Sequence, residues 1–149
     1  MQADLESLKV DLDIASNFFV QNPDTKEMPF MHSFPKNACE RSAALLMVVL
    51  KKKYKNSQVA LVRGRSRATG EMHFWLEIDN LVMDPTAHQF PEYSAPFVSS
   101  KPSPLEKQFP RDLELNNLHN DTDLPTNSGG RWNAAFTALY EALIVQRPF

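Results

Sequence analysis

Apolar residues near the start of the chain recur at steps of three and four positions. Over residues 4–20 they form one stripe of Leu5, Leu8, Leu12, Ala15 and Phe19. This spacing matches the 3.6-residue period of an α-helix with one buried face. The pattern predicts an amphipathic helix over residues 4–20, followed by a proline-containing loop over residues 21–37.

A second helix is predicted over residues 37–54, with Asn37 as a favourable N-cap residue. Its last turn is rich in lysine, which suits the negative end of the helix dipole. The middle of the segment, SAALLMVVL, is apolar on nearly all sides. A helix without a polar face is expected to lie buried at the centre of a domain.

The hydrophobic period changes to two after this helix. Residues 58–63 and Met72–Ile78 predict two strands, joined by a basic connection over residues 64–70. Asp79-Asn80 predicts a tight turn into a third strand that starts at Leu81–Asp84. These segments predict a small antiparallel sheet of three strands.

The second half of the chain carries fewer periodic signals. Residues 91–130 contain six prolines, which predicts a long and mostly irregular segment. Residues 131–146 predict a final helix, with Trp132, Phe136, Leu139, Tyr140 and Leu143 on one face. The element order predicts an α+β fold in a single domain over residues 1–149, with its core at about residues 35–90.

Composition narrows the class of protein. The chain has 149 residues, of which 42% are hydrophobic and 23% charged, as is typical of a soluble domain. The net charge of −2 argues against a nucleic-acid binder. The first residues lack the basic start and apolar stretch of a signal peptide, and no segment approaches the length of a membrane span. We therefore expect a cytoplasmic protein, with signal-less secretion or delivery into another cell left open.

The single cysteine, Cys39, excludes an intramolecular disulfide. It falls in the first turn of the predicted central helix. Unpaired backbone N–H groups and the positive end of the dipole stabilise a thiolate there and can hold a developing oxyanion. The spacing of Cys39, His73 and His88 matches no local zinc motif, so neither a metal nor a cofactor is expected.

A thiol nucleophile needs a base and a group that orients the base, and the predicted hairpin supplies both. With a two-residue loop at residues 79–80, Trp75 opposes Asp84 in the antiparallel register. Opposed residues share a face, and so do alternate residues along a strand. His73 and Asp84 are then diagonal neighbours, about 7–8 Å apart by backbone. We predict that Cys39 attacks, His73 moves the proton and Asp84 orients His73.

These residues resemble the transglutaminase-like branch of the papain-like cysteine protease superfamily. The matching pieces are NACERSAALL, HFWLEI and MDPT, in the family's order of Cys helix, His strand and Asp strand, within residues 35–88. The resemblance implies a papain-like core with the buried Cys helix packed on a small antiparallel sheet. It also implies the same three catalytic residues, Cys39, His73 and Asp84, and a thioester intermediate.

The chain departs from the papain pattern just before the cysteine. Residues 32–38 read HSFPKNA, so the glutamine that often donates to the oxyanion is absent there. Asn37, Ser33 and a backbone amide are the candidates for the second oxyanion donor. Trp75 is a candidate wall of the substrate pocket.

The resemblance implies acyl transfer at amide bonds of a protein or peptide substrate. Within that class it favours a protein glutamine deamidase or transglutaminase-like amidase over a general thiol protease, and a bacterial effector is one reading. A catalytically inactive papain-like binding module and a peptidoglycan amidase stay open as alternatives. No nucleic-acid or membrane partner is expected, whereas an inhibitor or immunity partner and the oligomeric state stay open.

Overall fold

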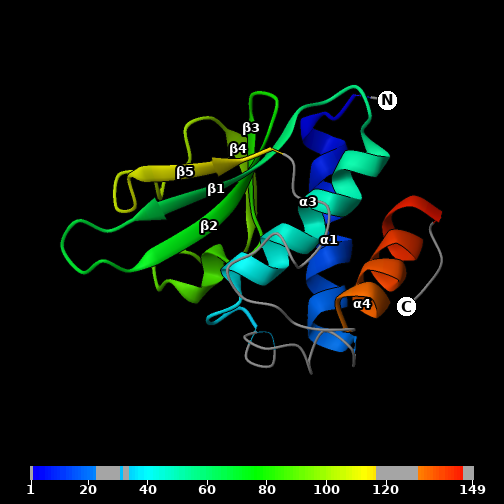
Figure 1. The fold of residues 1–149 in the computed structure, drawn as a ribbon, viewed down its shortest axis with the longest axis horizontal. Helices are drawn as coiled ribbons and strands as arrows, with labels where there is room; N and C mark the ends of the chain where they lie inside the picture. Colours follow the sequence, from blue (N-terminus) through cyan, green and yellow to red (C-terminus); the bar gives the residue numbers. More distant parts are fainter. Residues whose placement is uncertain (1, 23–30, 32–33, 117–130, 146–149) are drawn as a thin grey trace.

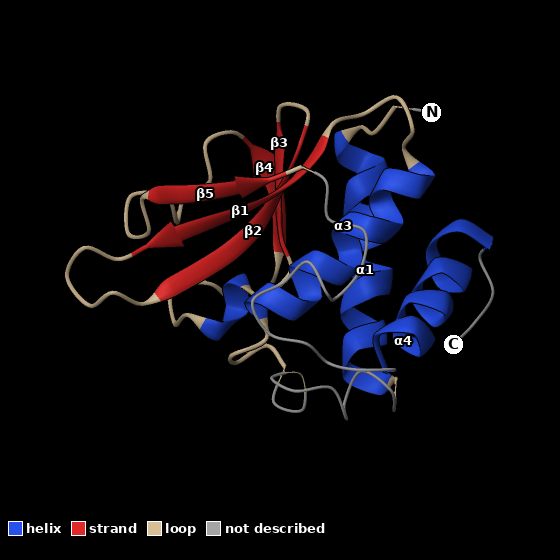
Figure 2. Ribbon diagram, in the orientation of Figure 1, coloured by secondary structure: helices blue, strands red, loops and turns tan. Residues whose placement is uncertain are grey.

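A computed structural model describes residues 2–22, 31, 34–116 and 131–145, and it has an α+β fold (Figures 1 and 2). In these ranges the α-helices are α1 (Leu5–Gln21), α3 (Cys39–Lys53) and α4 (Arg131–Tyr140). They lie together on one side of an antiparallel sheet (Figure 1). The α+β class expected from the sequence is confirmed. No helix among the described residues is both long and apolar enough to cross a membrane.

The sheet has five strands where the sequence predicted three. They are β1 (Val59–Arg65), β2 (Met72–Ile78), β3 (Leu81–Asp84), β4 (Phe97–Ser100) and β5 (Arg111–Leu115), arranged in the order β4-β3-β2-β1-β5. The prediction that residues 91–130 are mostly irregular is therefore wrong for β4 and β5. Both are short edge strands with weak sequence signals: β4 has no apolar alternation, and β5 has only Leu113 and Leu115 partly buried on one face. Pairing with β3 and β1 therefore contributes much of what defines their conformation.

Helix α1 begins at Leu5 because a capping box precedes it. The Asp4 carboxylate accepts a hydrogen bond from the Ser7 backbone N–H at 2.8 Å, and Ser7 Oγ accepts one from the Asp4 N–H at 3.2 Å. The buried face contains Leu8, Leu12, Ala15 and Phe19 of the predicted stripe, together with Asp11 and Phe18. The predicted stripe is thus confirmed except at Leu5, which is exposed.

Helix α3 is the buried central helix that the sequence predicted, since every residue from Arg41 to Leu50 is buried. The prediction that Asn37 caps it is wrong. The N-cap is Ala38, and Asn37 precedes it with a left-handed backbone (φ 58°) and an exposed side chain. An N-cap residue needs an extended backbone to direct its side chain at the helix. The N-cap residue Ala38 makes no side-chain hydrogen bond to the start of α3, because alanine has no polar side-chain atom.

The last predicted helix divides into two parts. Its α-helical part, α4, ends at Tyr140 and continues as a π-helical turn, η3 (Glu141–Val145). Leu139 and Leu143 are buried against the helix layer, and the Phe136 ring lies 6.0 Å from that of Tyr140. The side chain of Trp132 lies outside the described residues.

The two faces of the sheet have different covers. Side chains on one face join the helices in the main core: Leu61, Phe74, Leu76, Ile78 and Met83. Val62, Trp75 and Val82 point to the other face, where they pack against Leu105 and Phe109 from the connection between β4 and β5. The segment predicted to be irregular therefore covers the sheet face that carries His73 and Trp75.

Candidate functional site

The β2–β3 hairpin has the register on which the sequence argument depends. Leu76 pairs with Met83 and Ile78 pairs with Leu81, which leaves a two-residue loop whose first residue, Asp79, has φ 54°. The loop is even in length, so His73 and Asp84 share a face. His73 Nε2 lies 2.7 Å from Asp84 Oδ2, and both side chains are fully buried. The predicted pairing of these two residues is confirmed.

The Asp84 carboxylate is fixed at both oxygens. Oδ2 faces His73, and Oδ1 accepts a hydrogen bond from the backbone N–H of Thr86 at 3.2 Å. A carboxylate anchored in this way holds the imidazole ring in one orientation and supports a proton on it.

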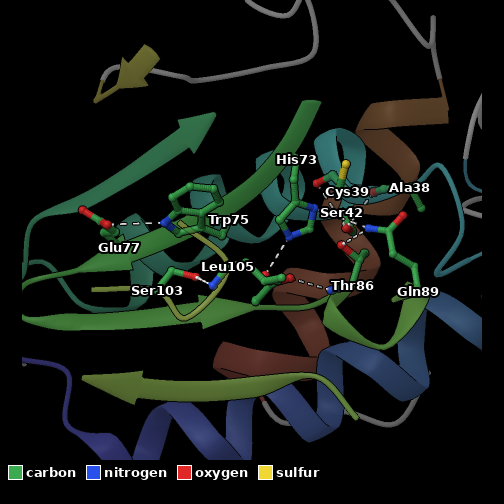
Figure 3. Close-up of polar contacts among 11 residues, drawn as sticks. Ala38, Cys39, Ser42, His73, Trp75, Glu77, Thr86, Gln89, Ser103 and Leu105 are labelled. Carbon is green, nitrogen blue, oxygen red and sulfur yellow. Dashed lines mark hydrogen bonds and ion pairs between the residues drawn. The ribbon is translucent and has the colours of Figure 1, made fainter. Parts of the chain in front are cut away.

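Cys39 is the first residue of α3 and is partly buried (Figure 3). It lies close enough to His73 to contribute to the raised pKa of that imidazole. Because Nε2 of the imidazole faces Asp84, Nδ1 is the ring nitrogen that can exchange a proton with the thiol. The structure thus brings Cys39, His73 and Asp84 together in one row.

The electrostatics of this row favour a protonated His73. Burial by itself would lower the pKa of His73. The charge of Asp84, the hydrogen bond to Asp84 and the neighbouring Cys39 outweigh burial and raise the pKa of His73 to about 10. An imidazole with this preference retains a proton taken from a neighbouring thiol.

Aromatic side chains surround the imidazole. The rings of Phe90, Phe109 and Trp75 lie 5.0, 5.5 and 6.0 Å from the His73 ring, centroid to centroid. Phe109 comes this close because Gly64 has no side chain, and a Cβ at Gly64 would collide with the Phe109 carbonyl oxygen. The apolar walls limit water around His73 and strengthen its interactions with Asp84 and Cys39.

Trp75 is fully buried, and its indole N–H is engaged inside the protein. Nε1 donates a hydrogen bond to Glu77 Oε2 at 3.3 Å (Figure 3), and Glu77 also pairs with Arg111 at 2.5 Å and Lys101 at 3.4 Å. The ring of Trp75 thus lies beside His73, while its N–H is hydrogen-bonded to Glu77. That Trp75 contacts substrate stays a prediction.

The structure does not assign the second oxyanion donor to either side chain that the sequence offered. Asn37 has an exposed side chain, and Ser33 lies outside the described residues. In the ranges that the structure describes, His, Cys, Asp and Glu side chains form no group of three that could hold a metal ion.

Sequence reasoning missed Gln89, the last residue of the 3₁₀ helix η1 (Ala87–Gln89). Its Nε2 lies 3.4 Å from His73 Nδ1 and donates a hydrogen bond to Thr86 Oγ1 at 3.1 Å. A helical turn after Asp84 would have placed Thr86 and Gln89, three residues apart, on one side. The loop-like sequence gave no sign of that turn.

Comparisons of the chain with protein-family models, with curated proteins and with solved structures found no match. The function of the site is therefore argued from its geometry.

Proposed function

We propose that this chain is a cysteine-dependent acyl-transfer enzyme, with a papain-like, transglutaminase-like core, that acts on amide bonds through a thioester intermediate. One observation carries the proposal. The buried His73 has Asp84 at one ring nitrogen, 2.7 Å away, and the free thiol of Cys39 lies close enough to the imidazole to raise its pKa. A nucleophile, a base and a group that orients the base are the minimum for nucleophilic catalysis by a thiol.

In the first step the Cys39 proton passes to His73 Nδ1, and the sulfur attacks the carbonyl carbon of the amide. A C–S bond forms, and the carbonyl π electrons move to oxygen. When that oxyanion collapses, the C–N bond breaks and the amine leaves with the proton held by His73. The products are the amine and a thioester on Cys39.

The second step releases the acyl group. Water, or a second amine, gives a proton to His73 and attacks the thioester carbon. Collapse of the new oxyanion breaks the C–S bond, and the sulfur recovers the proton from His73. Asp84 keeps Nε2 protonated and oriented in both steps, so His73 alternates between base and acid at Nδ1 only.

The start of α3 supports the same chemistry. Cys39 lies in the first turn, where the helix dipole is positive, and the N-cap residue Ala38 makes no side-chain hydrogen bond to the helix. Its backbone N–H groups are suited to stabilise both the thiolate and the oxyanion. A cysteine that served only for packing would gain nothing from this placement.

Within acyl transfer, we favour glutamine side chains of a protein or peptide as substrate, as a deamidase or transglutaminase-like amidase rather than a general protease. The order of Cys helix, His strand and Asp strand supports this branch. Release of ammonia from a blocked glutaminyl peptide, compared with cleavage of denatured casein, separates the two activities.

The proposal is tested first by the rate of iodoacetamide labelling of Cys39 between pH 5 and pH 9. In the wild type we expect labelling to stay fast as the pH falls from 8 to 6, because His73 takes the thiol proton. In His73→Ala the rate should fall about tenfold per pH unit, as for an isolated thiol. His88→Ala is the matched control, since it removes another histidine, which is partly buried and also lies within the electrostatic influence of Asp84.

A catalytically inactive binding module would give a different result. Cys39 would then react slowly in both proteins and become reactive only in urea. If His73→Ala does not fold, His73→Gln keeps a polar side chain of similar size at the buried position. Identical pH profiles in the wild type and in a folded His73 variant would contradict the proposed function.

A further inference from the structure

We propose that the side-chain amide of Gln89 is the second oxyanion donor of this site, a role that rests on the acyl-transfer function proposed above. Gln89 is the last residue of η1, and its Nε2 lies 3.4 Å from His73 Nδ1. In the proposed mechanism, Nδ1 is the nitrogen that exchanges a proton with Cys39. Figure 3 shows the amide on the side of the His73 ring where Cys39 lies. The Gln89 side chain is only partly buried, as a group that touches substrate must be.

Thr86 holds the amide in place. Gln89 Nε2 donates to Thr86 Oγ1 at 3.1 Å, while the Thr86 backbone N–H donates to Asp84 Oδ1 at 3.2 Å. One residue therefore anchors both the acid at one end of the imidazole and the amide at the other. This anchor limits the rotamers of a flexible glutamine side chain, so the donor is positioned before substrate binds.

The number of donors explains how the amide can serve an oxyanion. A glutamine amide has two N–H bonds. One is used by Thr86, and the other faces His73 Nδ1 at a long 3.4 Å. When Nδ1 carries a proton, as the raised pKa of His73 favours, it has no lone pair to accept that N–H. The N–H then has no partner on the imidazole and can donate to the carbonyl oxygen as negative charge develops there.

An interaction that forms only in the transition state lowers the barrier without tightening substrate binding. Gln89 would share the oxyanion with a backbone N–H at the start of α3, where the N-cap residue Ala38 makes no side-chain hydrogen bond. This assignment replaces the missing glutamine before Cys39 with one that follows Asp84 in the chain.

The test compares two reactions of the same thiol. Iodoacetamide is attacked at a saturated carbon, so its alkylation develops no oxyanion. With p-nitrophenyl acetate, the sulfur attacks a carbonyl carbon, an oxyanion forms, and nitrophenolate leaves with the electron pair of the broken C–O bond. In Gln89→Ala we expect acylation by the ester to fall about a hundredfold, with the alkylation rate within twofold of the wild type.

Two further variants sharpen the test. Gln89→Glu has nearly the same shape but places a negative charge beside His73. It should keep alkylation at least as fast as in the wild type, because it supports the imidazolium, and should slow acylation more than Gln89→Ala. Gln108→Ala, an exposed glutamine between β4 and β5, is the control and should change neither rate.

Other results overturn the inference. Equal losses of alkylation and acylation in Gln89→Ala would show that Gln89 acts through the orientation of His73 instead. Unchanged acylation would show that it has no role. A wild-type protein that is alkylated slowly and releases no nitrophenolate would defeat the proposed function itself, and that failure is visible before any Gln89 variant is made.

Discussion

Asp84 Oδ2 lies 2.7 Å from His73 Nε2, although the two residues meet only across the diagonal of a hairpin. The distance depends on the two-residue loop at residues 79–80. A shift of the register by one residue would turn Asp84 to the opposite face of the sheet, away from His73. The hairpin thus determines whether the orienting acid reaches the base.

Replacing Asp84 with asparagine should disrupt this relationship at one of two points. The carboxylate accepts from Thr86 at Oδ1 and faces His73 at Oδ2, whereas an amide has a single acceptor oxygen. Asp84→Asn must therefore leave either Thr86 or His73 facing an N–H₂ group. We expect acylation by p-nitrophenyl acetate to fall by a factor on the order of 10², and the unfolding free energy in urea to fall by about 1–3 kcal/mol.

Asp112→Asn is the control for that variant. Asp112 pairs with Arg63 and Arg65 at the surface, so its replacement should change stability by less than about 1 kcal/mol and leave acylation intact. An Asp84→Asn protein with wild-type acylation would mean that Asp84 does not orient a catalytic base.

The stability of the protein should depend on pH through His73. Its pKa is raised from 6.5 to about 10 in the folded state, after the charge and hydrogen bond of Asp84 overcome burial. The folded state therefore binds the proton more tightly than the unfolded state. The resulting stabilisation is complete below about pH 6.5 and is lost as the pH rises toward 10. Urea unfolding of the wild type and of His73→Gln should converge over this window, by at most about 1.4 kcal/mol per pH unit.

His88 should change stability with pH in the opposite direction to His73. Burial lowers its pKa, although the charge of Asp84 partly opposes that effect, so the folded state binds this proton less tightly. His88→Gln should gain stability relative to the wild type as the pH falls below about 6.5. Parallel stability profiles for the wild type and both variants would contradict these directions.

Gly64 permits the close approach of Phe109 to the imidazole. In Gly64→Ala the new Cβ would collide with the Phe109 carbonyl oxygen, a backbone atom that cannot rotate away. We expect an unfolding free energy about 2 kcal/mol lower, or more. Ester acylation should also slow, because Phe109 packs on the His73 ring.

Gly70→Ala is the control that separates the Gly64–Phe109 contact from the general effects of adding a methyl group to a glycine. Gly70 has φ 76°, and no atom of the described residues lies within 4 Å of the position that a Cβ would take there. Only backbone strain of about 1 kcal/mol is therefore expected. Its acylation rate should equal that of the wild type. Equal losses for the two variants would rule out the Phe109 contact as the reason for Gly64.

The sequence by itself determined the local elements and the pairing of His73 with Asp84. Helix periodicity, the apolar run in α3 and the alternation in β2 are properties of contiguous residues, and a two-residue turn leaves one register for the hairpin. Those signals also placed Cys39 in the first turn of its helix, because the apolar run begins at Ala43, one helical turn after it, although the N-cap is Ala38 and not the expected Asn37.

Only the tertiary structure decided the remaining parts of the site. The edge strands β4 and β5 carry too few apolar residues to be identified from their own pattern, and they form by pairing with β3 and β1. Gln89 is brought to His73 by a single turn of 3₁₀ helix, which is too short to give a periodic hydrophobic pattern in the sequence. Phe109, 36 residues beyond His73, packs on its ring because Gly64 has no side chain in the way. Such contacts depend on non-local packing, which a one-dimensional pattern does not encode.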